Sequence, residues 1–337
     1  MSAPDGSPRQ DAHGERGAAL ALVLVMLAIM SMLAAVVLET SRFSLRRTAN
    51  QAGLEQARWY LIGAEGYALR QIARLNDASA SGMVDQADWQ NVDKTLPLDN
   101  GAMTLRLRDG SNCFNLNSVV LRSEDGMLTA SPGGQIQFAR LLDATRVRLT
   151  GSPDAVLADW IDSDEVVLPG GAEDDMYASD GRGFRVANTL LGDLSELRRI
   201  AGFSPAVIDA LAPLACVRPD AALTTINVNT ILPDQAAILA AVMGDGVSVT
   251  VAQDVIRSRP RGGWADVDAF LAHPRFSGLE IPASLRAQLA TRSRYYVLQS
   301  QVRIEGGGEN ALALIDTAGR ARIVRRVFGV GAVGYAL

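Results

Sequence analysis

An uncharged apolar run near the amino terminus constrains this chain more than any other feature. Residues 18–38 read AALALVLVMLAIMSMLAAVVL, which is 21 residues without a charge. A helix rises about 1.5 Å per residue, so this run is long enough to cross a hydrocarbon layer about 30 Å thick. The core of a cleaved secretory signal is shorter, roughly 7 to 15 residues, and an Ala-x-Ala-like site follows it. The sequence therefore predicts one membrane-spanning helix.

The helix is expected to continue beyond the membrane. Leu54, Leu61, Ala68 and Leu75 recur every seven residues, with Ala57 and Ala64 between them, as in a helix that packs along one face. We predict that this helix ends at about Asn76 and lies half in lipid and half on a globular head. A plain juxtamembrane helix is the alternative.

Composition favours binding or structure over catalysis. The formal charge is -5, from 32 basic and 37 acidic residues, so the basic excess that attracts phosphate backbones is missing. Only His13 and His273 are available for imidazole metal clusters or histidine acid/base chemistry. The chain contains no Gly-x-Ser-x-Gly elbow and no Walker loop. We therefore expect no enzyme, and nucleic acid is a disfavoured partner.

The downstream part reads as a mixed α+β head with a helical insertion. Residues 103–108 alternate apolar and polar side chains like a half-buried strand, and residues 295–304, 311–315 and 321–328 also read as strands. Residues 131–291 are mostly helical in pattern. The sheet thus draws on both ends of the head, with a helical subdomain between them.

Two stretches of the insertion resemble helical hairpins. The first starts at Asp193 and continues through Leu211, and the second starts with Ile226-Asn-Val-Asn-Thr230 and turns at Gly244 and Gly246. In helix-hairpin-helix modules that bind DNA, such a glycine turn presents backbone N–H groups to a phosphate. The alternative is that the hairpins only pack as a subdomain.

Acidic residues crowd one loop of the insertion. Seven carboxylates lie between Asp159 and Asp175, on both sides of Pro169-Gly-Gly171. Like charges this close repel one another unless water or a cation separates them, and calcium takes 6 to 8 oxygen ligands. The EF-hand spacing is missing. The sequence leaves three interpretations: a solvated surface loop, a calcium site, or a pair of hydrolytic carboxylates. An aromatic content of 5% disfavours the sugar cleft that the third would require.

Cys113 and Cys216 are the two cysteines, and they form one possible pair. An oxidising compartment would permit a disulfide that ties the insertion to the head. Two buried free thiols are the alternative.

Several motifs together resemble the K-type minor pseudopilin of the type II secretion system. A polar leader ends in Arg16-Gly17 directly before the apolar run, as in prepilin-like processing sites. The internal motifs of this family follow in its order, namely Asn112-Cys-Phe-Asn-Leu-Asn117, Asp159-Trp-Ile-Asp162, Gly171-Ala-Glu-Asp174, Leu194-Ser-Glu-Leu197 and Ile226-Asn-Val-Asn-Thr230. An ordinary signal anchor with a chance Arg-Gly remains the alternative for the leader.

The resemblance implies a pilin-like fold, in which a leader (1–17) precedes a long amino-terminal helix (18–76). A head in two parts (77–130 and 292–337) would carry an inserted α-helical subdomain (131–291). Cleavage would fall between Gly17 and Ala18, and Leu22 stands where other pilin-like chains carry a glutamate. The chain would be a single-pass bacterial inner-membrane protein with its carboxyl-terminal part in the periplasm.

The resemblance also implies a site, a function and partners. It favours structural calcium, bound by Asp162, Asp164, Glu173, Asp174 and Asp175, and a Cys113–Cys216 disulfide. The function would be to cap a pseudopilus tip and support protein export across the outer membrane. Implied partners are the I-type and J-type minor pseudopilins, the prepilin peptidase and exported proteins. A membrane-tethered helix-hairpin-helix DNA receptor of competence type is the alternative function.

Overall fold

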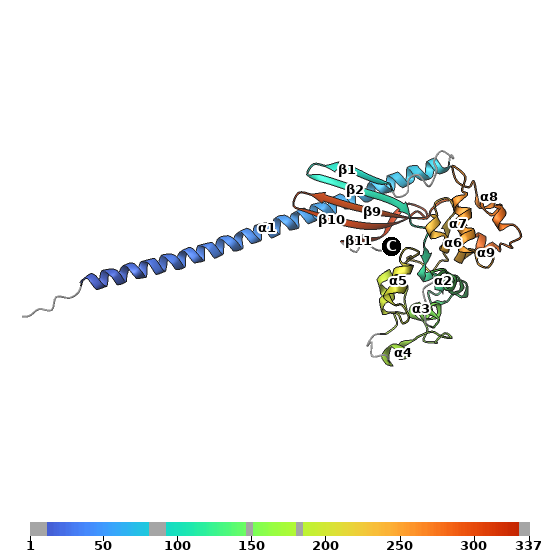
Figure 1. Ribbon diagram of the computed structural model, residues 1–337, viewed down its shortest axis with the longest axis horizontal. Coiled ribbons are helices and arrows are strands. Elements are labelled where there is room, and N and C mark those ends of the chain that lie inside the picture. The colour runs from blue at the N-terminus through green and yellow to red at the C-terminus, as the bar shows by residue number, and fades with distance from the viewer. Residues whose placement is uncertain (1–11, 81–91, 146–150, 180–184, 330–337) are drawn as a thin grey trace, which may run out of the picture.

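The computed structural model describes residues 12–80, 92–145, 151–179 and 185–329. A single helix, α1 (Ala12–Ala80, 69 residues), runs as a rod into a head at its carboxyl-terminal end, as Figure 1 shows. The part of α1 outside the head carries the apolar run and is long and apolar enough to cross a membrane. The helix begins at Ala12 and not after Gly17, and it ends four residues later than predicted.

A five-stranded antiparallel sheet forms the first layer of the head. Its order is β1 (Asp93–Leu98), β2 (Gly101–Asp109), β9 (Tyr295–Ile304), β10 (Gly307–Asp316) and β11 (Arg322–Phe328). The four predicted strands are confirmed, and they bring the two ends of the head together. Strand β1 was not predicted, because Asp93-Lys-Thr-Leu-Pro-Leu98 shows little apolar alternation and contains a proline. A proline is tolerated here because β1 is an edge strand.

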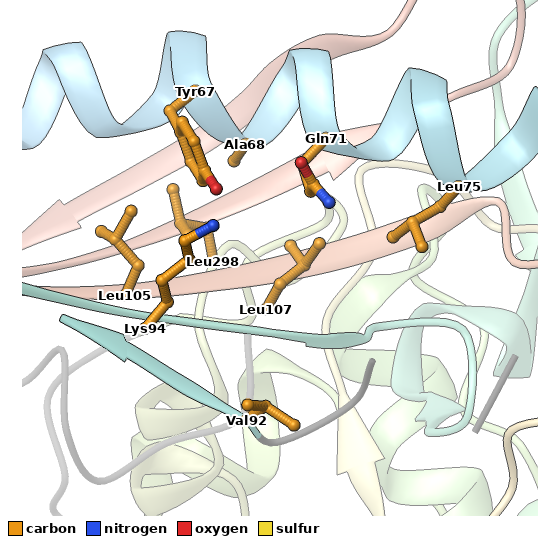
Figure 2. A pocket seen from close by; sticks show the side chains of 9 residues that line it. All are labelled: Tyr67, Ala68, Gln71, Leu75, Val92, Lys94, Leu105, Leu107 and Leu298. Atoms are coloured by element: carbon orange, nitrogen blue, oxygen red, sulfur yellow. The ribbon is translucent and has the colours of Figure 1, made fainter. Parts of the chain in front are cut away.

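Helix α1 packs across one face of this sheet. Ala57, Leu61, Ala64 and Ala68 of the heptad series are buried, with Ile72 one turn further on. The alanines let the helix approach the sheet closely, and strand residues such as Met103, Leu298 and Ala313 complete this core. A cavity of about 220 Å³ remains where Tyr67, Ala68 and Leu75 of α1 face Leu105, Leu107 and Leu298 of the sheet (Figure 2).

Buried Glu65 ties the same helix to the edge of the sheet. Its two carboxylate oxygens accept hydrogen bonds from the Arg326 guanidinium on β11. At Gly53, a Cβ would lie 2.8 Å from the carbonyl oxygen of Gly306, in the turn between β9 and β10. The helix and the hairpin can therefore meet only through a residue without a side chain at this point.

The insertion is a second, mainly helical layer that lies beyond one end of the sheet (Figure 1). Its helices and 3-10 turns are η1 (Leu116–Val119), α2 (Pro132–Thr145), α3 (Pro153–Ile161), α4 (Asp174–Ser179), η2 (Leu194–Arg199), α5 (Pro205–Leu211), η3 (Pro233–Gln235), α6 (Ala236–Met243), α7 (Val249–Arg257), α8 (Val267–Leu271), η4 (Pro274–Phe276) and α9 (Ala283–Arg286). Its short strands are β3 (Phe114–Asn115), β4 (Val120–Arg122), β5 (Leu128–Ala130), β6 (Ala215–Cys216), β7 (Ile226–Asn227) and β8 (Leu289–Ala290).

The predicted boundary at residue 131 is wrong, because it cuts through a continuous core. Phe114, Leu116, Val119 and Leu128 are buried in one cluster with the helices that follow. The ring of Phe114 stacks on that of Phe138, and β3 pairs in parallel with β6. The insertion therefore begins directly after β2. Its first apolar side chains occur in short segments without a visible period, so the sequence pattern placed residues up to 130 in the first part of the head.

Candidate functional site

Buried asparagines tie distant loops of the insertion together. Asn117 is fully buried, and its amide nitrogen donates to the carbonyl oxygens of Leu191 (3.1 Å) and Arg218 (2.7 Å). Its amide oxygen accepts from the backbone N–H of Leu191 at 2.8 Å. Asn115 donates to the carbonyl oxygens of Asp220 and Ala222, both at 3.0 Å. These side chains satisfy backbone groups of distant loops that form no regular ladder.

A second asparagine motif does the same at the start of the second hairpin. The amide nitrogen of Asn229 donates to the carbonyl oxygen of Trp264 at 2.9 Å, and its amide oxygen accepts from the Trp264 N–H at 2.6 Å. Asn227 is fully buried and donates to the Ser293 hydroxyl at 2.8 Å. The asparagines of this motif therefore brace loops inside the protein and do not face a phosphate.

The predicted disulfide is present. Cys113 and Cys216 are bonded across a sequence separation of 103, with their Cα atoms 5.7 Å apart. The Arg218 guanidinium donates to Cys113 Sγ at 2.7 Å and stacks on the Tyr295 ring at 4.4 Å. Burial lowers the pKa of Arg218 to about 10, so the group keeps its charge at neutral pH. The covalent bond and the asparagine contacts thus hold the same loops of the insertion, and Arg218 joins these loops to the start of β9.

In the acidic loop, Asp159 holds the backbone in place. It is fully buried at the end of α3, and its carboxylate accepts from the N–H groups of Leu168 (3.3 Å) and Ala172 (2.7 Å). A Cβ at Gly171 would collide with this carboxylate, so the loop can wrap around Asp159 only with a glycine there. Burial raises the pKa of Asp159, and the hydrogen bonds oppose that shift.

Asp162 and Glu173 lie buried at the two ends of this loop. Asp162 Oδ1 and both Glu173 carboxylate oxygens are enclosed without a hydrogen-bond partner among the described residues. Burial, followed by the charges of Asp164 and Asp159, raises the pKa of Asp162 to about 7. Burial and the neighbouring carboxylates likewise raise the pKa of Glu173 to about 7. Oxygens that are buried, close together and unsatisfied fit a hard cation such as calcium.

The other three predicted ligands lie at the rim. Asp164 and Asp175 are exposed, and Asp164 accepts from the Val166 N–H at 2.8 Å. Asp174 accepts from the Val186 N–H at 2.9 Å and faces the Arg185 guanidinium. Within the described part of the chain, no three His, Cys, Asp or Glu side chains are gathered as they stand into a set that could hold an ion. Only Asp162 and Glu173 of the predicted set point inward together.

The predicted processing and packing residues lie on the free part of α1. Gly17 is exposed, and a Cβ there would meet no atom within 4 Å. Leu22 is 61% exposed, as are its apolar neighbours to a similar degree. In this chain alone, these residues are accessible to a lipid phase, an enzyme or another helix.

Comparison with protein families gives two matches, both to the type II secretion system (T2SS), protein K. One matches residues 112–220 and the other residues 226–292, together more than half of the chain. The first match begins at Asn112, directly after β2, where the structure also places the start of the insertion.

Individual relatives extend the likeness over the whole chain. The type II secretion system protein K of Klebsiella pneumoniae is 32% identical over 325 residues, which cover 94% of this chain and 98% of that protein. The protein K of Aeromonas hydrophila is 33% identical over 291 residues, 83% of this chain and 86% of that protein. A chain in the crystal structure of the GspK-GspI-GspJ complex from enterotoxigenic Escherichia coli superposes with a TM-score of 0.68 at 28% identity. That superposition covers 84% of this chain and 99% of the other.

Proposed function

Because this chain belongs to the type II secretion system protein K family and is a minor pseudopilin, we propose that it caps the tip of a pseudopilus. One observation carries the proposal. The insertion lies beyond the end of the sheet that is farthest from the free apolar part of α1 (Figure 1). A bulky layer at the far end of the rod leaves the rod free to join a bundle of helices and covers the end of that bundle.

The partners of the proposed cap are the I-type and J-type minor pseudopilins. The similar chain from enterotoxigenic Escherichia coli was crystallised with GspI and GspJ, which supports this assignment. The cap would act without covalent chemistry, through helix packing along α1 and contacts between heads, and would support export of proteins across the outer membrane.

Leu22 supports a terminal position in the assembly. A glutamate at this place in pilin-like chains pairs with the amine of a neighbouring subunit, and a leucine side chain offers no charge for that pair. The test is to label this chain with antibody on overproduced pseudopili and locate it by electron microscopy. We expect label at fibre ends only; label along the fibre shafts would contradict the cap.

We further propose that cleavage after Gly17 leaves Ala18 as the first residue, and that the head lies in the periplasm. The exposed position of Gly17 supports access by a prepilin peptidase. Amino-terminal sequencing of protein from membranes tests this. Gly17→Val should leave the full-length chain and Gly14→Val should still be processed, whereas processing of the Gly17 variant would contradict the proposed site.

Calcium is the third part of the proposal. Asp162 and Glu173 would hold the ion, with Asp164, Asp174 and Asp175 close enough in sequence to add oxygens, and the bound charge would neutralise the buried carboxylates. The ion would stabilise the shape of the loop and supply no catalytic chemistry. We expect a chelator to lower the melting temperature of the full chain and of Asp209→Asn, which changes an exposed carboxylate elsewhere in the insertion. The melting temperature of Asp162→Asn should not change with the chelator. If the melting temperature of the parent protein does not change either, the proposed calcium site is wrong.

A further inference from the structure

A bare stretch of α1 separates the apolar run from the head. Every residue from Glu39 to Ala52 is exposed, and the first α1 residue that packs against the head is Gly53. We call residues 39–52 the neck. Because none of the described residues of the head covers the neck, its side chains are free to contact whatever surrounds the rod at this level.

Three arginines make the neck basic. Arg42, Arg46 and Arg47 lie on it, and Glu39 is its only acidic residue, which leaves a net charge of +2. No ion pair joins these arginines to any carboxylate in the described part of the chain. Three exposed cations on a neck with one carboxylate are therefore available to bind an external anionic group.

Helix geometry places the arginines at a membrane surface. If residues 18–38 fill the hydrocarbon layer, Arg42 lies about 6 Å and Arg47 about 14 Å beyond its edge. The headgroup layer extends roughly 5 to 8 Å from that edge. Side chains on a helix tilt toward its amino terminus, which here means toward the membrane, and long arginine side chains reach several ångströms further. Exposed Phe43 and Leu45 lie between the arginines and can enter the same interface.

We propose that Arg42, Arg46 and Arg47 bind the phosphate groups of anionic phospholipids on the membrane face where the head lies. A guanidinium forms paired hydrogen bonds to phosphate oxygens, which makes arginine well suited to this ligand. The inference rests on the proposed membrane span and not on the pseudopilus. It also accounts for positive charge beside the translocated part of the chain, where topology rules disfavour it. The contact would hold the subunit in the membrane until assembly removes it.

The experiment uses the full chain in a neutral detergent. Short-chain phosphatidylglycerol or phosphatidylcholine is titrated in, and native mass spectrometry counts bound lipid. A basic residue at an anionic surface is worth about a fivefold gain in binding, so we expect at least tenfold preference for phosphatidylglycerol. Arg42→Gln/Arg46→Gln/Arg47→Gln should abolish the preference, and higher salt should weaken it. Arg70→Gln/Arg74→Gln is the matched control, with two exposed arginines on the same helix at the level of the head.

The outcomes separate the inference from its premise. Flotation of the chain with vesicles of phosphatidylcholine alone tests the membrane span. Failure to float would contradict both the membrane span and the lipid site. Flotation without a preference for phosphatidylglycerol overturns only the lipid site. Three further outcomes would overturn the lipid site. The control pair could lose the preference equally, or millimolar inorganic phosphate could release the lipid. The triple variant could also lose partner binding while its lipid preference stays unchanged.

Discussion

At the scale of single residues, the side-chain amides of Asn115 and Asn117 replace secondary structure. Asn117 bonds to backbone groups 74 and 101 residues away, and Asn115 to groups 105 and 107 residues away. The loops they hold are irregular, so their N–H and C=O groups lack ladder partners. An asparagine amide supplies a donor and an acceptor on one rigid group, which suits this role.

Removing the Asn117 amide should destabilise the protein. Asn117→Ala leaves two buried carbonyl oxygens and one buried N–H unsatisfied, and we expect a loss of about 3 kcal/mol in the free energy of unfolding. Urea unfolding of the full chain in detergent, followed by tryptophan fluorescence, measures it. The control is Asn50→Ala on the exposed neck, which should change stability by less than about 0.5 kcal/mol. Equal effects in the two variants would contradict the bracing role.

The sequence marked these asparagines as a motif but could not assign their partners. Their spacing in 112–117 and 226–230 is recognisable, while the groups they bind are backbone atoms, which leave no trace in residue types. The acidic loop was likewise visible in the sequence, but the contacts of its side chains were not. Seven carboxylates were evident, yet only the fold shows that Asp159 accepts backbone N–H groups and that Asp162 and Glu173 are buried together.

The buried carboxylates give stability a pH dependence of known sign. In the folded chain the pKa values of Asp162 and Glu173 rise from 3.8 and 4.5 to about 7. Between these values the folded state binds more protons than the unfolded state, so stability falls as pH rises from about 4 to about 7. Calcium-free protein should therefore melt at a higher temperature at pH 5.5 than at pH 8. The double variant Asp162→Asn/Glu173→Gln should lose most of this difference, and the same slope in both proteins would refute the assignment.

At the scale of secondary-structure elements, strong periodicity was the reliable guide. The heptad series located the buried face of α1, and alternation located β2 and the three carboxyl-terminal strands, all of which the structure confirms. Short elements were not predicted from the sequence. The edge strand β1 lacks alternation, and β3 to β5 are only two or three residues long, too short for any period to be visible. The positions of β3 to β5 are set by the core of the insertion and not by local pattern.

Adjacent residues on α1 offer a matched test of its packing face. Leu61 is 1% exposed against the sheet, whereas Ile62, turned about 100° around the helix axis, is 37% exposed. Leu61→Ala should cost about 2 to 5 kcal/mol, because it removes buried methyl groups and leaves a cavity in a helix-sheet interface. Ile62→Ala should cost well under 1 kcal/mol in the isolated chain. Thermal and urea unfolding of the two variants compare them directly, and a larger loss for Ile62 would show that the helix face is wrongly assigned.

At the scale of the whole molecule, two cores share one junction. The core between α1 and the sheet and the larger core of the insertion are separate clusters, and the chain passes between them only after β2 and before β9. A cap that must transmit contacts from the rod to a partner surface needs this junction to be stiff. Partly buried Asp109, at the end of β2, contributes by accepting hydrogen bonds from Thr230 of the insertion and from Ser293, just before β9.

The disulfide should stiffen the insertion next to this junction. It closes a loop with a sequence separation of 103, for which the chain-entropy model gives about 4.7 kcal/mol as an upper figure. Cys113→Ala/Cys216→Ala should therefore unfold at a clearly lower urea concentration than the parent protein. A reductant should lower the midpoint of the parent protein and leave the variant unchanged, which separates the bond from the effect of the substitutions. Because Asn115 and Asn117 hold the same loops of the insertion as the disulfide, adding Asn117→Ala to the cysteine variant should cost more than the two losses added together. Simple additivity would mean that the amides and the disulfide stabilise these loops independently.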